Sequence, residues 1–431
     1  MKHFLITLFL FSLILPVSAQ IRGNNIVVTV SPDHSDWNYT VGEKAKFNVC
    51  VLKSGTPLSD AIVDYEAGPV MFPDTKKNHI KLHNGQMQWS GTMSKPGFYR
   101  LKVTAHVGDK TYEGLCTAAF SPDKLTPYTK EPKDFDAFWT NTLRQARQTS
   151  LEPTRTLLPE RCTEEVNVYE VSFQTDRWGS RFYGILSIPT RPGRYPALLR
   201  VPGAGVRPYQ GDAWTASKGA ITLEVGIHGI PVTLEQKVYD NLAAGALDNY
   251  WNSHLDDPSK NYYRRVVTGC VRAVDYIASL PEWNGKDLGV TGSSQGGFLS
   301  LSTAALDNRV SFIGVIHDAL CDHEAERNGV AGGWPHYFYQ VKNPSEKDIE
   351  GARYYDGVNF AKRVKCPAWF SFGYNDETVP PTSSYSTYNV YGGPKTLSVY
   401  PQTGHFWYQE QWDEWEQWLL KQMGIGKDNS K

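Results

Sequence analysis

The sequence predicts an α/β protein with a mostly parallel, doubly wound sheet, preceded by a separate and smaller β-sandwich. Short alternating strands fill residues 21–120, a Pro- and Lys-rich stretch follows, and apolar strands then alternate with amphipathic helices. With 431 residues, the chain is long enough for two hydrophobic cores. We therefore expect a sandwich over residues 20–120, a linker over 121–134 and an α/β domain over 135–425.

The first nineteen residues have the pattern of an export signal. Lys2 and His3 precede an apolar run over residues 4–15, and Val17-Ser18-Ala19 supplies the small residues of a cleavage site. A membrane span needs about twenty apolar residues, so this run is too short to anchor the chain. Gln20 rather than a cysteine follows, which argues against lipid attachment. We expect cleavage after Ala19 and export to the periplasm or the medium.

The predicted sandwich rests on two-residue alternation of apolar and polar side chains, which is the period of a strand with one buried face. Turn pairs such as Ser54-Gly55 and Asn84-Gly85 separate the strands, and residues 97–103 resemble the start of an immunoglobulin-type strand. The strands are expected at residues 26–30, 45–52 and 99–105. This pattern predicts an immunoglobulin-like β-sandwich.

The predicted α/β domain begins with a helix over residues 135–147. Apolar residues at helical spacing over residues 262–280 indicate a second, longer helix with one buried face. The strands are expected at residues 166–173, 182–188, 197–201, 220–225, 288–290, 312–316, 368–372 and 396–400. Alternation of apolar strands with helices implies a mostly parallel sheet that is covered on both faces.

Composition excludes some classes of function. A formal net charge of −1 without basic runs argues against nucleic acid as a partner. The 13 Trp and 24 Tyr residues suit surfaces that stack on sugars, although large cores explain most of such an excess. No Cys/His spacing resembles a zinc site. Of the six cysteines, Cys50 and Cys116 lie in one predicted domain and are the pair we expect to be bridged in an oxidising compartment.

The pentapeptide Gly292-Ser293-Ser294-Gln295-Gly296 stands between a predicted strand and a predicted helix. In that context Gly-x-Ser-x-Gly is the nucleophile elbow of α/β-hydrolases, a tight turn that strains the central serine and exposes its hydroxyl. The N-terminus of the following helix favours an anion that forms near Ser294. Such pentapeptides also occur by chance in loops, so this match alone is a hypothesis.

The partners that a nucleophilic serine needs follow in the expected order. Asp376 comes in the loop after one late apolar strand, and His405 comes in the loop after the next. We expect His405 to accept the proton of Ser294 and Asp376 to orient His405. Taken singly, a turn-forming Asp or a loop His would be equally ordinary, but three residues in the order Ser, Asp, His favour catalysis.

Two backbone N–H groups are needed to bind the oxyanion of the tetrahedral intermediate. One is expected from Gln295, directly after the nucleophile, and the other from Ala204 in the loop after the third strand. Pro202 has no N–H, and Gly203 is a weaker candidate. His317-Asp318, after the strand that follows the elbow, is a candidate substrate-pocket pair, although a structural loop is the simpler interpretation.

Over about residues 125–425 the chain resembles the acetyl xylan esterase/cephalosporin deacetylase family, carbohydrate esterase family seven. The matching segments are residues 132–139, 292–297, 304–310, 355–367 and 376–381. The departures from the family pattern are Val225-Gly226-Ile227-His228-Gly229 in place of Arg-Gly-Gln, Phe406 in place of the Glu after the histidine, and Pro202-Gly203-Ala204 in place of His-Gly-Tyr. The family forms a hexameric ring, whose contacts the additional sandwich could obstruct.

The resemblance implies hydrolysis of small acyl esters, chiefly acetyl groups on plant-cell-wall sugars. We therefore expect a secreted serine esterase that deacetylates plant polysaccharides or oligosaccharides and needs no metal or cofactor. One alternative is a prolyl-oligopeptidase-type peptidase, which shares the triad order but normally carries a much larger β-propeller. The other is a carbohydrate-binding protein with a vestigial hydrolase domain, in which the sandwich provides the function.

Overall fold

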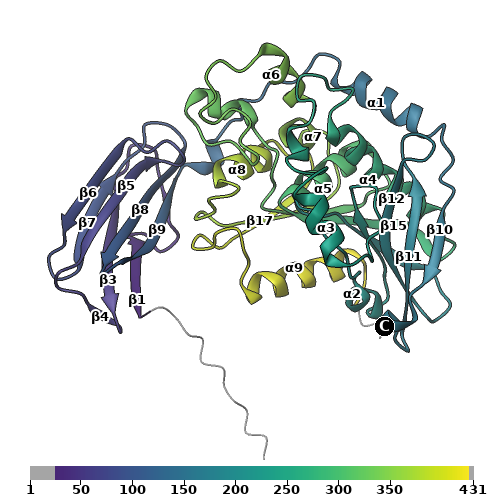
Figure 1. Cartoon of the computed structure of the whole chain (residues 1–431), viewed down its shortest axis with the longest axis horizontal. Coiled ribbons are helices and arrows are strands. Elements are labelled where there is room, and N and C mark those ends of the chain that lie inside the picture. The colour runs from purple at the N-terminus through teal and green to yellow at the C-terminus, as the bar shows by residue number, and fades with distance from the viewer. Residues whose placement is uncertain (1–24, 427–431) are drawn as a thin grey trace, which may run out of the picture.

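The computed structural model describes residues 25–426 and has an N-terminal β-sandwich and a larger α/β body (Figure 1). One sheet of the sandwich has the order β1-β3-β4 with β7 paired to β3, and the other has the order β2-β9-β8-β5-β6. The strands are β1 (Ile26–Pro32), β2 (Asn38–Tyr39), β3 (Ala45–Lys53), β4 (Thr56–Pro57), β5 (Ile62–Pro69), β6 (Thr75–Lys81), β7 (Gln86–Gly91), β8 (Gly97–Val107) and β9 (Lys110–Phe120). The expected β-sandwich is confirmed.

The expected Cys50–Cys116 disulfide is wrong, because both residues are free thiols. Side chains alternate between the two faces of a strand. On β3 the inward positions belong to Val49 and Val51, so Cys50 lies on the opposite, partly exposed face. Cys116 is fully buried in the core of the sandwich, beside Leu101 and its neighbours. The Cys116 side chain therefore points into the core between the two sheets, whereas the Cys50 side chain points away from it.

The α/β body is built on a sheet with the strand order β10-β11-β12-β14-β13-β15-β16-β17-β18. From β14 to β18 the neighbouring strands are parallel, whereas β10, β11 and β12 form an antiparallel edge. The strands are β10 (Thr154–Leu157), β11 (Val166–Gln174), β12 (Arg181–Pro189), β13 (Tyr195–Arg200), β14 (Ile221–Gly226), β15 (Trp283–Ser293), β16 (Phe312–Ile316), β17 (Ala368–Phe372) and β18 (Lys395–Val399). The predicted α/β-hydrolase sheet is confirmed.

Helices cover both faces of this sheet, as the alternation of β13 demonstrates. Ala197 and Leu199 point into the large core that contains α4 and α5, whereas Leu198 packs in a second core with Trp415 and Leu419 of α9. The helices are α1 (Phe135–Ala146), α2 (Ala213–Ser217), α3 (Gln236–Ala243), α4 (Tyr262–Ala278), α5 (Gln295–Leu306), α6 (Glu346–Arg353), α7 (Gly357–Ala361), α8 (Pro381–Val390) and α9 (Gln409–Gln422). This burial on two faces explains the continuous apolar runs of the central strands.

A third apolar cluster joins the sandwich to the body. Val70, Phe98 and Ala119 of the sandwich pack in it with side chains from β17, from the loop after β17 and from α8. The segment expected as a linker is held at two points: Leu125 packs in this cluster, and the Thr129 hydroxyl donates to Asp356 Oδ2 of the α/β body at 2.7 Å. The exact limits of the domains stay a prediction, but the two parts share a packed interface.

The predicted export signal lies outside the described residues. Within residues 25–426, no helix is long and apolar enough to cross a membrane. Cleavage after Ala19 and export therefore stay predictions.

Candidate active site

Ser294 occupies a strained turn between the end of β15 and the start of α5. Its φ of 62° and ψ of −123° lie outside the regions that residues with a side chain ordinarily adopt. A β-carbon at Gly292 would lie 2.7 Å from the α-carbon of Gly296, and one at Gly296 would lie 2.6 Å from the carbonyl oxygen of Val201. The turn therefore requires glycine at both positions, which is the physical basis of the pentapeptide.

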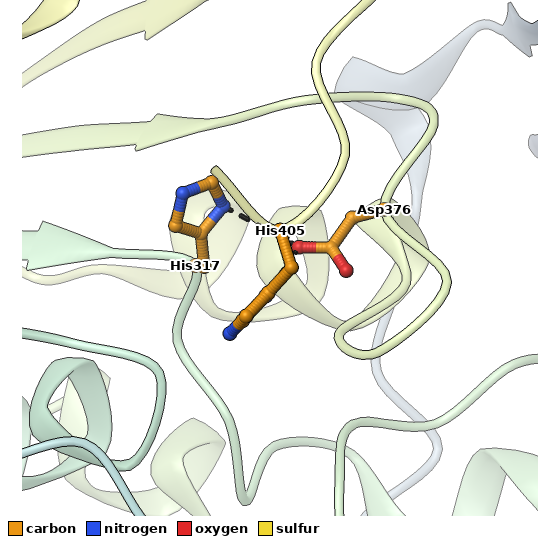
Figure 2. Close-up of side chains that lie close together, drawn as sticks. All are labelled: His317, Asp376 and His405. Atoms are coloured by element: carbon orange, nitrogen blue, oxygen red, sulfur yellow. Dashed lines mark hydrogen bonds and ion pairs between the residues drawn. The ribbon is translucent and has the colours of Figure 1, made fainter. Parts of the chain in front are cut away.

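Asp376 and His405 lie together on the loops that follow β17 and β18 (Figure 2). His405 Nδ1 donates to Asp376 Oδ2 at 2.7 Å, while Asp376 Oδ1 accepts the backbone N–H groups of Thr378 and Val379 at 2.8 Å each. Burial alone would raise the pKa of Asp376, but the nearby imidazoles of His317 and His405, the latter hydrogen-bonded to it, outweigh burial and hold that pKa well below its usual range. The carboxylate is therefore ionised and holds Nδ1 of His405 protonated.

A second histidine, His317, shares the same carboxylate. Its Nδ1 lies 3.4 Å from Asp376 Oδ2, and its ring centroid lies 5.0 Å from that of His405. Burial lowers the pKa of His317, against the opposing effect of Asp376, so the ring is neutral near pH 7. The structure thus divides the candidate pair His317-Asp318, because Asp318 points away from Asp376 to the buried hydroxyl of Thr387. The sequence indicated His317 as a candidate site residue because it directly follows the predicted strand that became β16, the neighbour of β15.

The backbone places Ser294 beside this group. Ser294 N donates to Ile316 O at 2.8 Å, and Ala319 N donates to Ser294 O at 3.1 Å, so the residues that flank His317-Asp318 are bonded to the elbow. Within the described chain, no hydrogen bond links the Ser294 hydroxyl to His405. Catalytic hydrogen bonds are commonly long in unliganded enzymes and tighten only with substrate.

The predicted oxyanion donors lie on two segments that Gln295 ties together. Its buried side chain accepts hydrogen bonds from the hydroxyls of Tyr250 at 2.6 Å and Tyr263 at 2.9 Å, and donates to Pro202 O at 3.2 Å. The N–H of Gln295 is the first of α5 and has no intrahelical partner. Among residues 25–426, the N–H of Ala204 has no acceptor. Both donors are thus free for a ligand, and their role stays a prediction.

His228 braces the loop that carries Ala204. Its Nε2 lies 3.0 Å from Gly205 O and its Nδ1 lies 2.7 Å from the hydroxyl of Tyr262. Burial lowers the pKa of His228 to about 4, so the neutral ring donates through Nε2 and accepts through Nδ1. Among the residues that sequence reasoning considered, His228 had no assigned role, and its contacts now make it a support of the oxyanion loop.

A cavity of about 440 Å³ adjoins the elbow, lined by Gly203 and Ser293. Its wall includes Arg207, Glu224 and the indole of Trp412, which is 42% exposed. Exposed aromatic faces with neighbouring charged groups offer both stacking and hydrogen bonds to a polar ligand. The lining of this cavity includes neither Ser294 nor His405, so the cavity borders the turn without containing the proposed nucleophile or its base.

His317, Asp376 and His405 also offer ligand atoms that lie within 4.8 Å of one another. Two imidazoles and a carboxylate suit a divalent transition metal. The short hydrogen bond from His405 to Asp376 is equally the arrangement of an oriented general base, which acts without a metal. The expectation that catalysis needs no metal stays a prediction.

Comparison with known proteins gives consistent matches. A family model described as acetyl xylan esterase (AXE1) matches residues 121–422. Acetyl esterase Axe7A of Xylanibacter ruminicola is 38% identical over 409 residues, 93% of this chain and 92% of its own length. A match of that length must include most of the N-terminal sandwich.

Two solved structures share the fold. They are an acetyl xylan esterase from Paenibacillus sp. R4, 24% identical, and acetyl xylan esterase 1 from Thermoanaerobacterium sp. JW/SL YS485, 23% identical, both with a TM-score of 0.61. The matches cover 70% of this chain and 98% and 97% of those chains. At this identity the likeness supports the α/β-hydrolase fold alone.

Proposed function

This chain belongs to the acetyl xylan esterase family and is a carboxylic ester hydrolase, and we propose that it is a secreted serine esterase that uses Ser294, His405 and Asp376. The observation that carries the proposal is the 2.7 Å hydrogen bond between His405 and the buried Asp376, on loops beside the strained turn at Ser294. A strained serine beside an oriented imidazole is the arrangement that activates a hydroxyl nucleophile.

In the first half of the reaction, the Ser294 hydroxyl oxygen attacks the carbonyl carbon of the ester while Nε2 of His405 accepts the hydroxyl proton. Asp376 holds Nδ1 protonated, so Nε2 is the free base. The N–H groups of Gln295 and Ala204 bind the oxyanion that forms. One such donor typically contributes about 3–4 kcal/mol to the stabilisation of the transition state. The intermediate then expels the sugar alcohol, which takes its proton from His405.

In the second half, water attacks the acetyl-serine ester. His405 accepts a proton from that water, and the same two N–H groups bind the second oxyanion. The bond between the acetyl carbon and the Ser294 oxygen then breaks, Ser294 takes the proton back from His405, and acetic acid leaves and ionises to acetate. The neutral state of His317 suits this cycle, because a second imidazolium beside Asp376 would weaken the stabilisation of protonated His405.

The proposed substrate is an acetylated plant polysaccharide or oligosaccharide. The name of the relative Axe7A supports the acetyl ester, and the family description, acetyl xylan esterase, supports a sugar as the alcohol. Export of the chain would place the enzyme where such polymers are found.

Ser294→Ala tests the proposal directly. We expect the variant to fold like the wild type but to release no acetate above background from acetylated xylo-oligosaccharides, since the substitution removes only one hydroxyl. A serine-reactive phosphonate should label the wild type at Ser294 and leave the variant unlabelled. Activity near that of the wild type in Ser294→Ala would refute the assignment of the nucleophile.

The same preparation separates the two alternatives. Hydrolysis of proline-containing amide substrates without acetate release would favour a peptidase. Binding of acetylated sugars without phosphonate labelling or turnover would favour a vestigial hydrolase.

A further inference from the structure

The loop that carries Asp376 rests on the N-terminal sandwich. Each of four consecutive loop residues contacts the sandwich with a different group. The contacts are Tyr374 Oη to Asn38 Oδ1 at 3.0 Å, Asn375 Nδ2 to Leu115 O at 3.3 Å, Asp376 O to Arg100 Nη2 at 2.9 Å, and Glu377 Oε1 to Lys102 Nζ at 3.2 Å. The loop that carries the proposed catalytic acid is therefore bonded to the sandwich at every residue from 374 to 377.

Arg100 makes the central contact. Its Nη2 donates to the carbonyl oxygens of Tyr374 at 3.0 Å and Asp376 at 2.9 Å. Its Nε donates to the Thr117 hydroxyl at 2.8 Å, from the position directly across the β8–β9 ladder. Thr117 is fully buried, so the acceptor that orients the guanidinium is itself held by packing. One planar group thus joins two strands of the sandwich to the two ends of a three-residue loop segment.

The acid loop in turn holds the histidine loop. Tyr374 N donates to Pro401 O at 3.0 Å, and Asn375 N donates to Thr403 O at 3.1 Å. A β-carbon at Gly373 would overlap the carbonyl oxygen of Thr403, which leaves no room between the loops. A shift of the segment 374–376 would therefore move both Asp376 and the backbone that leads to His405.

We propose that Arg100 is a positioning residue, through which the N-terminal sandwich sets the place of Asp376 and so the orientation of His405. The inference rests on the proposed function of Asp376. In this proposal the sandwich contributes to catalysis without binding a sugar. It supplies the guanidinium that donates to the carbonyl oxygens of the loop. Arg100 touches neither the substrate nor the reacting atoms.

The chemistry of the contact explains the choice of arginine. Burial lowers the pKa of Arg100, while Glu377 and Asp376 raise it, and a guanidinium stays charged in either case. Two buried carbonyl oxygens that lose a charged donor must move toward water or other donors, since buried polar groups are costly to leave unpaired. Tyr374 and Asp376 are almost fully buried, so their carbonyl oxygens depend on donors supplied by the protein.

Arg100→Met is the primary variant, because methionine keeps much of the apolar stem and removes every N–H donor. Lys102→Met is the matched control, on the same strand and against the same loop, where the ion pair with Glu377 is exposed. Arg100→Lys keeps the charge and a donor that can reach one carbonyl. The readouts are kcat and KM on acetylated xylo-oligosaccharides, the rate of phosphonate labelling, and thermal unfolding.

For Arg100→Met we expect kcat to fall at least about tenfold with KM changed less than about threefold, since displacement of a catalytic group by 1 Å can cost about 100-fold in rate. Labelling should slow in parallel, Arg100→Lys should recover part of the loss, and Lys102→Met should stay within about twofold of the wild type. A purely structural role would lower the thermal unfolding temperature and leave kcat of the folded enzyme unchanged.

The proposal is overturned if folded Arg100→Met keeps its kcat, if its loss lies in KM alone, or if Lys102→Met loses as much. If Arg100→Met does not fold, Thr117→Val removes only the acceptor of Nε, and an unchanged kcat in that variant overturns the proposal as well. An active Ser294→Ala would instead refute the proposed function. An inactive Ser294→Ala beside a fully active Arg100→Met would refute only the role of Arg100.

Discussion

Replacement of Asp376 by Asn probes how the carboxylate acts on His405. The substitution preserves size, and an amide oxygen at the Oδ1 position can still accept the N–H groups of Thr378 and Val379. The amide nitrogen would then face Nδ1 of His405, where the carboxylate oxygen now accepts a hydrogen bond at 2.7 Å. Two donors cannot share that hydrogen bond, so the imidazole must move its proton to Nε2.

The expected magnitude follows from the wrong tautomer. An imidazole that is protonated at Nε2 cannot accept the proton of Ser294, and the equivalent change in serine hydrolases lowers kcat about 10⁴-fold. That factor corresponds to about 5.5 kcal/mol of lost transition-state stabilisation. His317 does not substitute for the carboxylate, because burial lowers its pKa and a neutral imidazole carries no negative charge to stabilise protonated His405.

The assay measures kcat for acetate release at pH 7, with circular dichroism and thermal unfolding to establish that the variant folds. Ser294→Ala sets the background, and Glu377→Gln, one residue along the same loop but exposed at the surface, is the control that should keep its activity. A folded Asp376→Asn enzyme that retains more than about one-hundredth of the wild-type kcat would refute the assignment of Asp376 as the orienting acid.

Two further predictions concern stability and the support of the oxyanion loop. Gln295→Met should lower the free energy of unfolding by about 2–4 kcal/mol, because the buried hydroxyls of Tyr250 and Tyr263 lose their acceptor, and should lower kcat as the loop at Pro202 is released. Chemical denaturation and steady-state kinetics measure both effects, and an unfolding free energy equal to that of the wild type would contradict the network. Burial raises the pKa of Asp318 to about 7 in the folded state. The free energy of unfolding of Asp318→Asn, taken relative to that of the wild type at the same pH, should therefore be higher at pH 8 than at pH 5. Because the folded-state pKa lies above the unfolded value, the contribution of Asp318 to the stability of the wild type is fully present below about pH 4. It is lost as the pH rises toward 7, by up to about 4 kcal/mol. Urea denaturation of both proteins at the two pH values measures the difference, and parallel pH dependences would contradict the assignment.

Much of the fold and of the candidate site could be predicted from local patterns. Two-residue alternation identified the sandwich, and apolar strands separated by helical periods identified the parallel sheet. Ser294, Asp376 and His405 were predicted as a group because each follows an apolar strand, and the carboxyl ends of parallel strands meet at one edge of a sheet. The structure brings Asp376 and His405 into contact on that edge.

The sequence was less informative wherever a side chain's partner is distant or its face is ambiguous. The expected Cys50–Cys116 bridge failed because membership of one domain does not say which face of a strand a cysteine occupies. His317 was recognised as a candidate but not as a partner of Asp376, since its neighbour in sequence, Asp318, is not its neighbour in space.

The sequence by itself determined the two parts of the fold, the order of the central strands and the chemical groups at the edge of the sheet, because backbone periodicity and turn chemistry act over a few residues. Only the tertiary structure decided that Arg100 of the sandwich lies against the carbonyl oxygen of Asp376, 276 positions along the chain. The reason is that a guanidinium recognises two carbonyl oxygens by their geometry in space, and no local pattern in the sequence records which backbone will be brought to it. The contact between the sandwich and the proposed site is therefore visible only in the folded chain.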